Sequence, residues 1–440
     1  MILKITKNTD PVWKKKFSDV QVTPSLQKIV SDMHETLAFT MGVGLAAPQV
    51  GYPWRLFIVD FADLKETFIN PKIIKKNEKT DLVEEGCLSI PSYRGFIERP
   101  TELELEYTNL KGERKQAKLS GFYARIIQHE YDHLNSTFYT DHITKPKYLY
   151  HFDPVRIVFF GSDRFSATIL KSLIGQSVIG EYQVPLVITK GDKPSGRGDS
   201  VLSNPVKSLA QQFNIETLTP EKITDSYEKI ASSKPDLLVL ASYGKIIPKE
   251  ILEIPKYYSL NVHPSLLPKH RGASPLQTVL LKGDKTTGVS IMAMNEKVDQ
   301  GDVFVRGRYS LKPNETYESL SRQLSKIGAE LLHYVIHGVV MGQSIIKGKK
   351  LGGLKPKPQK HEKATYTKLI KKEDGKIAWK KPPVNLERMI RAYYPWPGVW
   401  CEYNGKILKL LPNHMVQLEG KNPVSLSSFK AGHKDFTLTW

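Results

Sequence analysis

Two histidines one helical turn apart constrain this chain more than any other feature. The segment His129-Glu130-Tyr131-Asp132-His133 places them at positions i and i+4, with a carboxylate directly after the first. On an α-helix this spacing puts both imidazoles on one face, where they can hold one metal ion while Glu130 reaches a bound water. The segment therefore predicts a helix that serves a metal-dependent hydrolase. The alternative is a helix that carries two surface histidines.

Two upstream segments supply the remaining parts of such a site. Glu85-Gly86-Cys87-Leu88-Ser89 offers a thiolate as a third ligand, and the glycine-rich run 42–49 ends in the amide of Gln49. A Cys-His-His set leaves one tetrahedral position open, as a catalytic metal requires. A water in that position becomes a nucleophile near neutral pH. Ligand softness suits zinc and iron about equally well, and a small buried hydrophobe is the alternative interpretation of Cys87.

In order and spacing, these three segments resemble the signature motifs of the peptide deformylase family, over about residues 1 to 150. The resemblance implies an α+β fold, ferrous iron as the metal with zinc as the alternative, and N-formylmethionyl nascent peptides as substrates, hence ribosome proximity. It implies that Glu130 takes and returns the proton, while the Gln49 side chain and the Leu88 backbone amide polarise the formyl oxygen. The implied metal ligands are Cys87, His129 and His133.

After residue 154 the sequence restarts with the apolar run Val155-Arg156-Ile157-Val158-Phe159-Phe160-Gly161. Such a run predicts a buried parallel strand that enters a turn. Further strand-like runs lie at 186–188, 236–240 and 288–292, and helical segments such as 205–213 lie between them. The alternation predicts an open α/β domain with a parallel sheet. In such a sheet the functional residues lie at the carboxyl ends of the strands.

One predicted strand end carries Ser259-Leu260-Asn261-Val262-His263-Pro264-Ser265-Leu266-Leu267-Pro268, and Val298-Asp299-Gln300-Gly301-Asp302 follows later. Together with Arg271-Gly272 these segments resemble the formyltransferase signature. The resemblance implies that Asn261, His263 and Asp299 form the catalytic trio. An amide and an imidazole can stabilise a tetrahedral oxyanion, and a carboxylate can hold the imidazole charged. The implied donor is 10-formyltetrahydrofolate, and the candidate donor-binding residues are Ser265, Leu266, Leu267 and Pro268.

The acceptor is suggested by the basic, glycine-rich loop 190–198 and by Pro205-Val206-Lys207 after it. The loop resembles the one by which the methionyl-tRNA formyltransferase family contacts its acceptor stem, and the resemblance covers about residues 155 to 410. It implies initiator methionyl-tRNA as the acceptor and a small C-terminal β-barrel of oligonucleotide-binding topology. A flexible basic loop without a partner is the alternative. The candidate tRNA contacts are Lys193, Arg197 and Lys207.

The formal charge of +19 over 440 residues falls mostly after residue 150, as expected of a polyanion-binding surface or of a lysine-rich solvated face. Lysines mixed with glycine and proline predict an exposed basic linker at 346–363. Its lysines are Lys347, Lys349, Lys350, Lys355, Lys357, Lys360 and Lys363. The expected domains are therefore 1–150, 155–345 and 364–440, joined by that linker.

Two cysteines exclude a disulfide framework, and Cys401 lies in a hydrophobic stretch where we expect it to be inert. The opening residues 1–5 lack a long apolar run, and no stretch approaches the roughly 20 apolar residues of a membrane span. We therefore expect a cytoplasmic protein with no membrane partner.

Three positions depart from the family patterns. Ser136 stands where deformylases usually carry glycine, and Asp163 where formyltransferases usually carry proline. The tail after Leu411 matches poorly, so the barrel is expected to lack or replace a final strand. We expect the nearby aromatic residues to pack in the core rather than to stack on bases. These are Tyr393, Tyr394, Trp396 and Trp400.

The leading hypothesis is a bifunctional enzyme that removes formyl from peptides and adds formyl to initiator methionyl-tRNA. One rival is a formyltransferase that acts on a sugar-nucleotide or another small amine. The other is that the N-terminal part is a non-catalytic module that binds the ribosome or tRNA.

Overall fold

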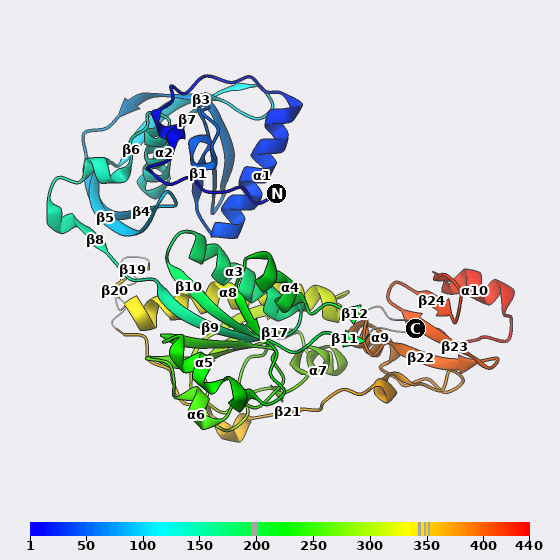
Figure 1. Cartoon of the computed structure of the whole chain (residues 1–440). Coiled ribbons are helices and arrows are strands. Elements are labelled where there is room, and N and C mark those ends of the chain that lie inside the picture. The colour runs from blue at the N-terminus through cyan, green and yellow to red at the C-terminus, as the bar shows by residue number, and fades with distance from the viewer. Residues whose placement is uncertain (195–200, 342–344, 347–348, 351–352) are drawn as a thin grey trace. The chain divides into compact units, whose positions relative to one another are not determined.

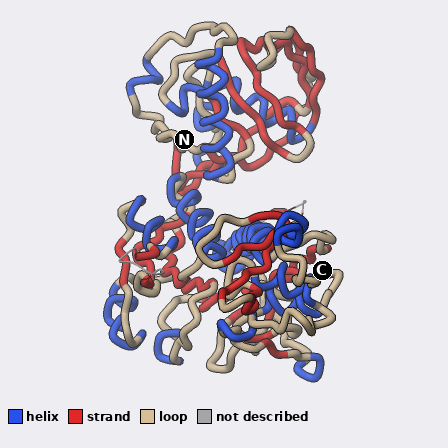
Figure 2. Tube along the Cα trace, turned by 90° about the vertical axis from the view of Figure 1, so that its right-hand side faces the viewer, coloured by secondary structure: helices blue, strands red, loops and turns tan. Residues whose placement is uncertain are grey.

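The computed structural model describes residues 1–194, 201–341, 345–346, 349–350 and 353–440 (Figure 1). The chain divides into two compact units. One comprises Met1–Val155 with Lys171–Val184, and the other comprises Arg156–Leu170 with Pro185–Trp440. Both units contain helices and strands, as Figure 2 shows by colour.

The first unit is built on an antiparallel sheet in the order β1-β2-β3-β6-β7. Its strands are β1 (Gly44–Ala46), β2 (Leu56–Phe61), β3 (Leu64–Lys76), β6 (Glu102–Thr108) and β7 (Arg114–Ser120). A second sheet joins β4 (Thr80–Cys87), β5 (Ile90–Pro100) and β8 (Leu149–His151). The two long helices are α1 (Pro24–Thr40) and α2 (Gly121–His133). This is the α+β architecture expected of the first part.

Alternation along β2 explains how this sheet carries a helix on each face, because successive side chains of a strand point to opposite sides. Leu56 and Ile58 belong to the core cluster of α1, with Val30 and Met33. Phe57 and Val59 belong instead to the cluster of α2, with Ala124 and Ile127. The helix predicted around His129 is thus fixed against the sheet by its own apolar face.

The second unit contains a seven-stranded sheet in the order β13-β10-β9-β14-β15-β17-β18. The strands are β9 (Val155–Gly161), β10 (Tyr182–Ile188), β13 (Glu216–Leu218), β14 (Leu237–Ala241), β15 (Tyr258–His263), β17 (Thr286–Ala293) and β18 (Val303–Ser310). Strand β14 pairs parallel with β9 and β15, whereas β17 pairs antiparallel with β15 and β18. The expected all-parallel sheet is therefore wrong, and the sheet is mixed. The connection 294–302 is too short for the crossover that a parallel β17–β18 pair would need.

Helices cover both faces of this sheet. They are α3 (Arg164–Val178), α4 (Pro205–Gln212), α5 (Tyr227–Ser232), α6 (Lys249–Leu252), α7 (Pro275–Lys282) and α8 (Tyr317–Ile336). Ile230 of α5 and Ile251 of α6 share one core cluster with Val158 and Leu238 of the sheet. Helix α8 lies on the other face, where Gly328 comes close to Val262 (Figure 1).

Asp163 acts as the N-terminal cap of α3. Its Oδ1 accepts hydrogen bonds from the backbone N–H of Ser166 at 2.9 Å and from the Ser166 hydroxyl at 2.9 Å. A carboxylate in this position satisfies a donor that the helix itself leaves free. The departure from proline therefore leaves the helix start intact.

The C-terminal part holds an antiparallel sheet in the order β22-β23-β24-β25. Its strands are β22 (Val399–Tyr403), β23 (Lys406–Leu411), β24 (Met415–Leu418) and β25 (Val424–Ser425), and α9 (Leu386–Tyr393) and α10 (Leu426–Gly432) flank them.

Tyr393 is buried, as expected. Trp396 is 56% exposed, so the expectation of core packing is wrong for that residue.

The basic linker is exposed at its described lysines but buried at one residue. Its short strands β19 (Ile345–Ile346) and β20 (Lys349–Lys350) pair with each other. Lys347 lies outside the described residues, as do the side chains of Lys349 and Lys350. From Lys355 to Lys363 the lysines are exposed, but Gln359 among them is buried, so the expectation of a wholly exposed linker is wrong there.

In the described part of the chain, no helix has both the length and the apolar character needed to cross a membrane.

Candidate active sites

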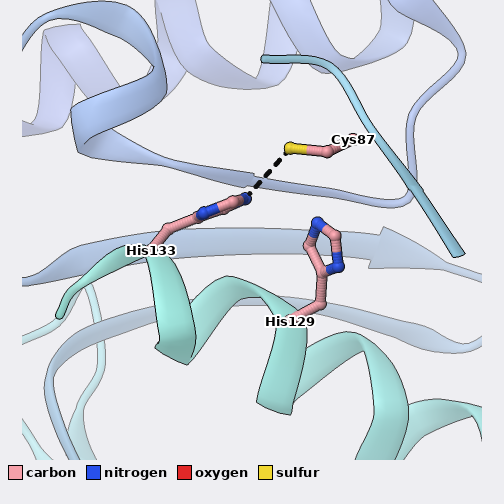
Figure 3. Close-up of side chains that lie close together, drawn as sticks. All are labelled: Cys87, His129 and His133. Atoms are coloured by element: carbon pink, nitrogen blue, oxygen red, sulfur yellow. Dashed lines mark hydrogen bonds between the residues drawn. The ribbon is translucent and has the colours of Figure 1, made fainter. Parts of the chain in front are cut away.

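Helix α2 and the end of β4 bring Cys87, His129 and His133 together (Figure 3). One ligand atom from each lies within 4.8 Å of the others, and Cys87 Sγ is 3.3 Å from His133 Nε2. Both imidazoles point from the same face of α2 toward the thiol, as the i, i+4 spacing predicts. Three converging soft donors fit a divalent metal of the zinc or iron type.

The two imidazoles are oriented through their Nδ1 atoms. His129 Nδ1 lies 2.8 Å from Glu85 Oε2, and His133 Nδ1 lies 3.2 Å from the backbone oxygen of Thr137. Such contacts fix the ring planes and direct Nε2 toward a metal. The geometry therefore agrees with a metal site rather than with two surface histidines.

A buried ion-pair network holds Glu85 in turn. Arg99 donates to both carboxylate oxygens, at 2.7 and 3.0 Å, and Arg125 Nη1 donates to Oε1 at 2.7 Å. Arg99 also donates to Asp132 at 2.7 Å. Burial alone would raise the pKa of Glu85, but the contacts from His129 and Arg99 outweigh it and hold that pKa well below its usual range. Glu85 thus remains a carboxylate.

Cys87 is poised as a thiolate. Burial would raise the pKa of its thiol, but the positive charge of His133 and the hydrogen bond with His129 lower that pKa to about 5. The thiolate is the form of cysteine that binds a metal. The interpretation of Cys87 as an inert hydrophobe therefore does not fit this environment, whereas burial raises the pKa of Cys401 to about 11.

Glu130 lies directly against this cluster, in the pocket that Gly44 and Gln49 also line. It is 4% exposed, and its Oε2 makes no hydrogen bond within the described residues. Burial raises the pKa of Glu130 to about 7, a value suited to proton transfer at neutral pH. Any side chain at Gly44 would collide with the Glu130 carboxylate, which explains the glycine.

Gln49 reaches the same pocket from the short 3-10 helix Ala47–Val50. Its Oε1 accepts from the backbone N–H of Ala46 at 2.8 Å, and its Nε2 lies 3.5 Å from Cys87 Sγ. The first contact fixes the amide so that its N–H groups face the thiolate. Leu88 also lines the pocket, directly after Cys87.

In the second unit, Asn261 and His263 lie at the carboxyl end of β15 and Asp299 lies in the loop between β17 and β18. Asn261 Nδ2 donates to Asp299 Oδ1 at 3.2 Å, and His263 Nδ1 is 3.6 Å from the same oxygen. The backbone N–H of Gly272 donates to Asp299 Oδ2 at 2.7 Å. His263 Nε2 lies 3.0 Å from the backbone oxygen of His270. The three predicted residues therefore meet around one carboxylate.

The turn 265–268 follows directly. Ser265 and Leu267 are buried, and Ser290 ties them together: its hydroxyl donates to Ser265 O at 2.7 Å and accepts from Leu267 N at 3.1 Å. Leu266 and Pro268 are half-buried. The turn is therefore anchored to β17 through the Ser290 hydroxyl.

The three candidate tRNA contacts differ in how far the structure describes them. Lys193 begins the hairpin of β11 (Lys193–Pro194) and β12 (Val201–Leu202), but its side chain lies outside the described residues, as does the whole of Arg197. Lys207 Nζ lies 2.7 Å from Asp192 Oδ2. It therefore has a partner within the chain.

Known proteins resemble this chain over most of its length. Residues 155–336 match the family model of formyl transferase, and residues 369–427 match that of the formyl transferase C-terminal domain. A methionyl-tRNA formyltransferase of Caldanaerobacter subterraneus is 38% identical over 272 residues, which are 61% of this chain and 84% of the relative. The chain belongs to the methionyl-tRNA formyltransferase family. Another such formyltransferase, from Hydrogenobaculum, is 40% identical over 256 residues, which are 58% of this chain and 80% of the relative.

A deformylase domain precedes the formyltransferase domains. Residues 2–148 match the family model of polypeptide deformylase. The solved peptide deformylase of Thermotoga maritima is 38% identical and its match covers 33% of this chain and 99% of that one, with a TM-score of 0.32.

Several residues that support the two sites were assigned no role from the sequence, although Glu85 and Arg271 stand in the quoted motifs. In the deformylase domain these are Glu85, Arg99 and Arg125. Arg125 had a signal, because it lies between the apolar residues Ala124 and Ile126 of a helix. In the formyltransferase domains the missed residues are Arg271 and Gln359, and the only signal for Gln359 is an uncharged amide within a run of lysines.

Proposed function

We propose that this chain is a bifunctional enzyme that deformylates N-formylmethionyl peptides and formylates initiator methionyl-tRNA. The observation that carries the proposal is the presence of two complete and separate constellations in one chain. Cys87, His129 and His133 converge beside Glu130, whose Oε2 has no hydrogen-bond partner among the described residues. Asn261, His263 and Asp299 converge in the second unit.

In the deformylase domain, the two histidines and the thiolate would hold the metal. When bound, the metal supplies Lewis-acid activation of water. Glu130 accepts the proton of the attacking water and returns it to the departing amine, for which a pKa near neutral pH is suited. The Gln49 amide and the backbone N–H of Leu88 stabilise the formyl oxygen as negative charge develops on it.

Ferrous iron is our choice of metal, with zinc as the alternative. The choice rests on the resemblance to peptide deformylases, since thiolate and imidazole donors accept both ions. Metal analysis of protein purified without oxygen distinguishes them.

In the formyltransferase domain, the methionyl α-amine attacks the formyl carbon of 10-formyltetrahydrofolate. A bond forms between that nitrogen and the formyl carbon, the bond from the formyl carbon to N10 of the folate breaks, and the amine proton passes to N10. Asn261 and His263 stabilise the oxyanion, and Asp299 orients both through its Oδ1. Ser265, Leu266, Leu267 and Pro268 would serve the donor by shaping the turn beside it.

Basic residues of the linker and of the segment after β10 would bind the tRNA. Exposed Lys355, Lys357 and Lys360, with Lys193, Arg197 and Lys207, are the groups we assign to its phosphates. We infer domain limits of 1–150, 155–345 and 364–440, with the linker at 346–363 and the last domain a small barrel. Deformylation of nascent chains would place the enzyme near ribosomes in the cytoplasm.

A paired assay tests the proposal. Purified protein receives formyl-methionyl peptide in one tube, and methionyl-tRNA with 10-formyltetrahydrofolate in the other. We expect both products. A chain that formylates small amines but not methionyl-tRNA, or that carries metal but releases no formate, would contradict the corresponding half.

A further inference from the structure

Gln359 is an uncharged residue in the lysine-rich linker and is only 4% exposed. The linker reaches the formyltransferase core here: Lys357 exchanges two backbone hydrogen bonds of 2.9 Å with Val303, at the start of β18. Two residues further on, the Gln359 side chain points inward while the flanking Lys357 and Lys360 remain exposed. The linker thus places one amide inside the core.

That amide holds the loop that carries Asp299. Its Nε2 donates to the backbone oxygen of Asp299 at 2.9 Å and to that of Gly301 at 2.6 Å. A primary amide has two N–H donors, and both are used on this loop.

The loop needs such support because its backbone is strained. Asp299 has φ of 54°, in the left-handed region that non-glycine residues avoid. Gly301 is equally constrained, since a Cβ there would collide with the backbone of Ala293. Strained conformations persist only where their surroundings fix them, and Gln359 is one of these surroundings.

The same amide also binds Arg271. Gln359 Oε1 accepts from Arg271 Nη2 at 2.8 Å, and Arg271 is 1% exposed. The residue after it, Gly272, is the one whose N–H donates to Asp299 Oδ2. Strands β16 (Arg271–Gly272) and β21 (Tyr366–Thr367) pair, so the segment just after the linker also contacts Arg271–Gly272.

From this geometry we infer that Gln359 is a positioning residue for formyl transfer. It fixes the Asp299 loop through Nε2 and the Arg271–Gly272 segment through Oε1, and so sets the carboxylate against Asn261 and His263. The formyltransferase site is therefore incomplete without the linker. The inference rests on the proposed role of Asp299 in formyl transfer.

Two substitutions of Gln359 distinguish the hydrogen bonds that it makes through Nε2 from the one that it makes through Oε1. Gln359→Leu removes all three hydrogen bonds, whereas Gln359→Glu keeps an acceptor for Arg271 but removes both donors to the loop. A misplaced catalytic group can reduce turnover by about a hundredfold. We expect both variants to reduce kcat for formyl transfer at least about tenfold, with the KM for methionyl-tRNA changed by less than about threefold.

Three controls accompany them. Gln417→Leu makes the same chemical change at a residue whose Nε2 donates to the nearby Lys421 O, and should leave kcat unchanged. Deformylation by the same preparations should also be unchanged. Thermal unfolding shows how much folded protein each assay contains.

A double-mutant cycle tests whether Gln359 acts through Asp299. If it does, Gln359→Glu should reduce the residual transfer of an Asp299→Asn variant by less than about threefold. A wild-type kcat in Gln359→Glu, or a multiplicative loss in the double variant, would overturn the inference. Absence of formyl transfer in the wild-type chain would instead refute the proposed function.

Discussion

At the scale of single residues, the deformylase site depends on charge states that neighbours impose. Glu130 is buried beside a glycine that leaves room for its carboxylate, and burial raises its pKa to about 7. The pKa of the Cys87 thiol is lowered instead, to about 5, because the effects of His133 and His129 outweigh that of burial. The same pocket therefore holds an anionic ligand and a carboxyl group ready to exchange a proton.

Replacing Glu130 by glutamine should abolish deformylation and retain the metal, because it removes the proton carrier and no ligand. We expect a loss of at least about a hundredfold in kcat, the usual contribution of a positioned acid or base. Formate release and metal content measure the two quantities. Near-normal peptide turnover by a metal-replete variant would show that another group carries the proton.

Replacing Glu85 by glutamine should weaken metal binding about 10- to 100-fold, because Glu85 orients His129. In metal-free protein it should also lower the free energy of unfolding by about 3 kcal/mol, since it leaves Arg99 and Arg125 short of a buried partner.

The folded-state pKa of Glu85 lies below its ordinary value, so its stabilisation is full above about pH 4.5 and is lost as the pH falls further. The stability difference between wild type and Glu85→Gln should therefore be constant from about pH 6 to 8 and shrink below about pH 4.5. Urea unfolding with a chelator present measures it, and a difference that grows on acidification would rule out this explanation.

At the scale of elements, the end of α2 shows how the chain accommodates serine in place of glycine. Ser136 has φ of 53°, and its hydroxyl donates to the backbone oxygen of Trp13 at 2.9 Å. The Trp13 ring lies 5.6 Å from the His133 ring, centroid to centroid. The hydrogen bond thus ties the segment that covers His133 to the helix end, and offsets the strain.

Substitution of Ser136 separates these two effects. Ser136→Ala keeps the strain and loses the hydrogen bond, and should lower the free energy of unfolding by about 1 kcal/mol. Ser136→Gly loses the bond but also the strain of about 1 kcal/mol, and should remain within about 0.5 kcal/mol of wild type. Equal losses in both variants, measured by urea unfolding, would mean that the left-handed conformation stores no strain.

At the scale of the whole molecule, the two proposed activities share one chain but use different residues. Deformylation needs a metal ion, whereas formyl transfer needs a folate donor. Removal of the metal by a chelator should abolish deformylation and leave formyl transfer within about twofold, because Asn261, His263 and Asp299 provide no metal site among the described residues. The two assays on one chelated sample decide this. Parallel loss of both would show that the transfer reaction also needs the ion.

The net charge of +19 should make tRNA binding strongly salt-dependent. Replacing Lys193 and Arg197 by alanine should raise the apparent KM for tRNA and flatten its log-log salt dependence by up to about one unit per lost contact. Lys207→Ala should flatten it less, because Asp192 already partly neutralises that ammonium. An unchanged salt slope in the double variant would favour a small-amine acceptor.

Local patterns in the sequence predicted the candidate chemistry. The i, i+4 spacing of His129 and His133 fixed their common face, and the run Val155–Gly161 predicted a strand whose bounds are those of β9. Local periodicity is enough for such predictions, because it depends only on neighbours along the chain. The same local signals could not show that β17 runs antiparallel to β15, since strand direction depends on how the connections cross the sheet.

The groups that contact the proposed reacting residues became visible in the folded chain. Glu85 lies 44 positions from His129, and Gln359 lies 60 from Asp299, so no local pattern links them. Gln359 is preceded and followed by exposed lysines, and its burial results from a linker that pairs with β18. The proposed reacting residues were predicted from their type and spacing, whereas the residues that contact them are brought close only by folding, which sequence separation does not determine.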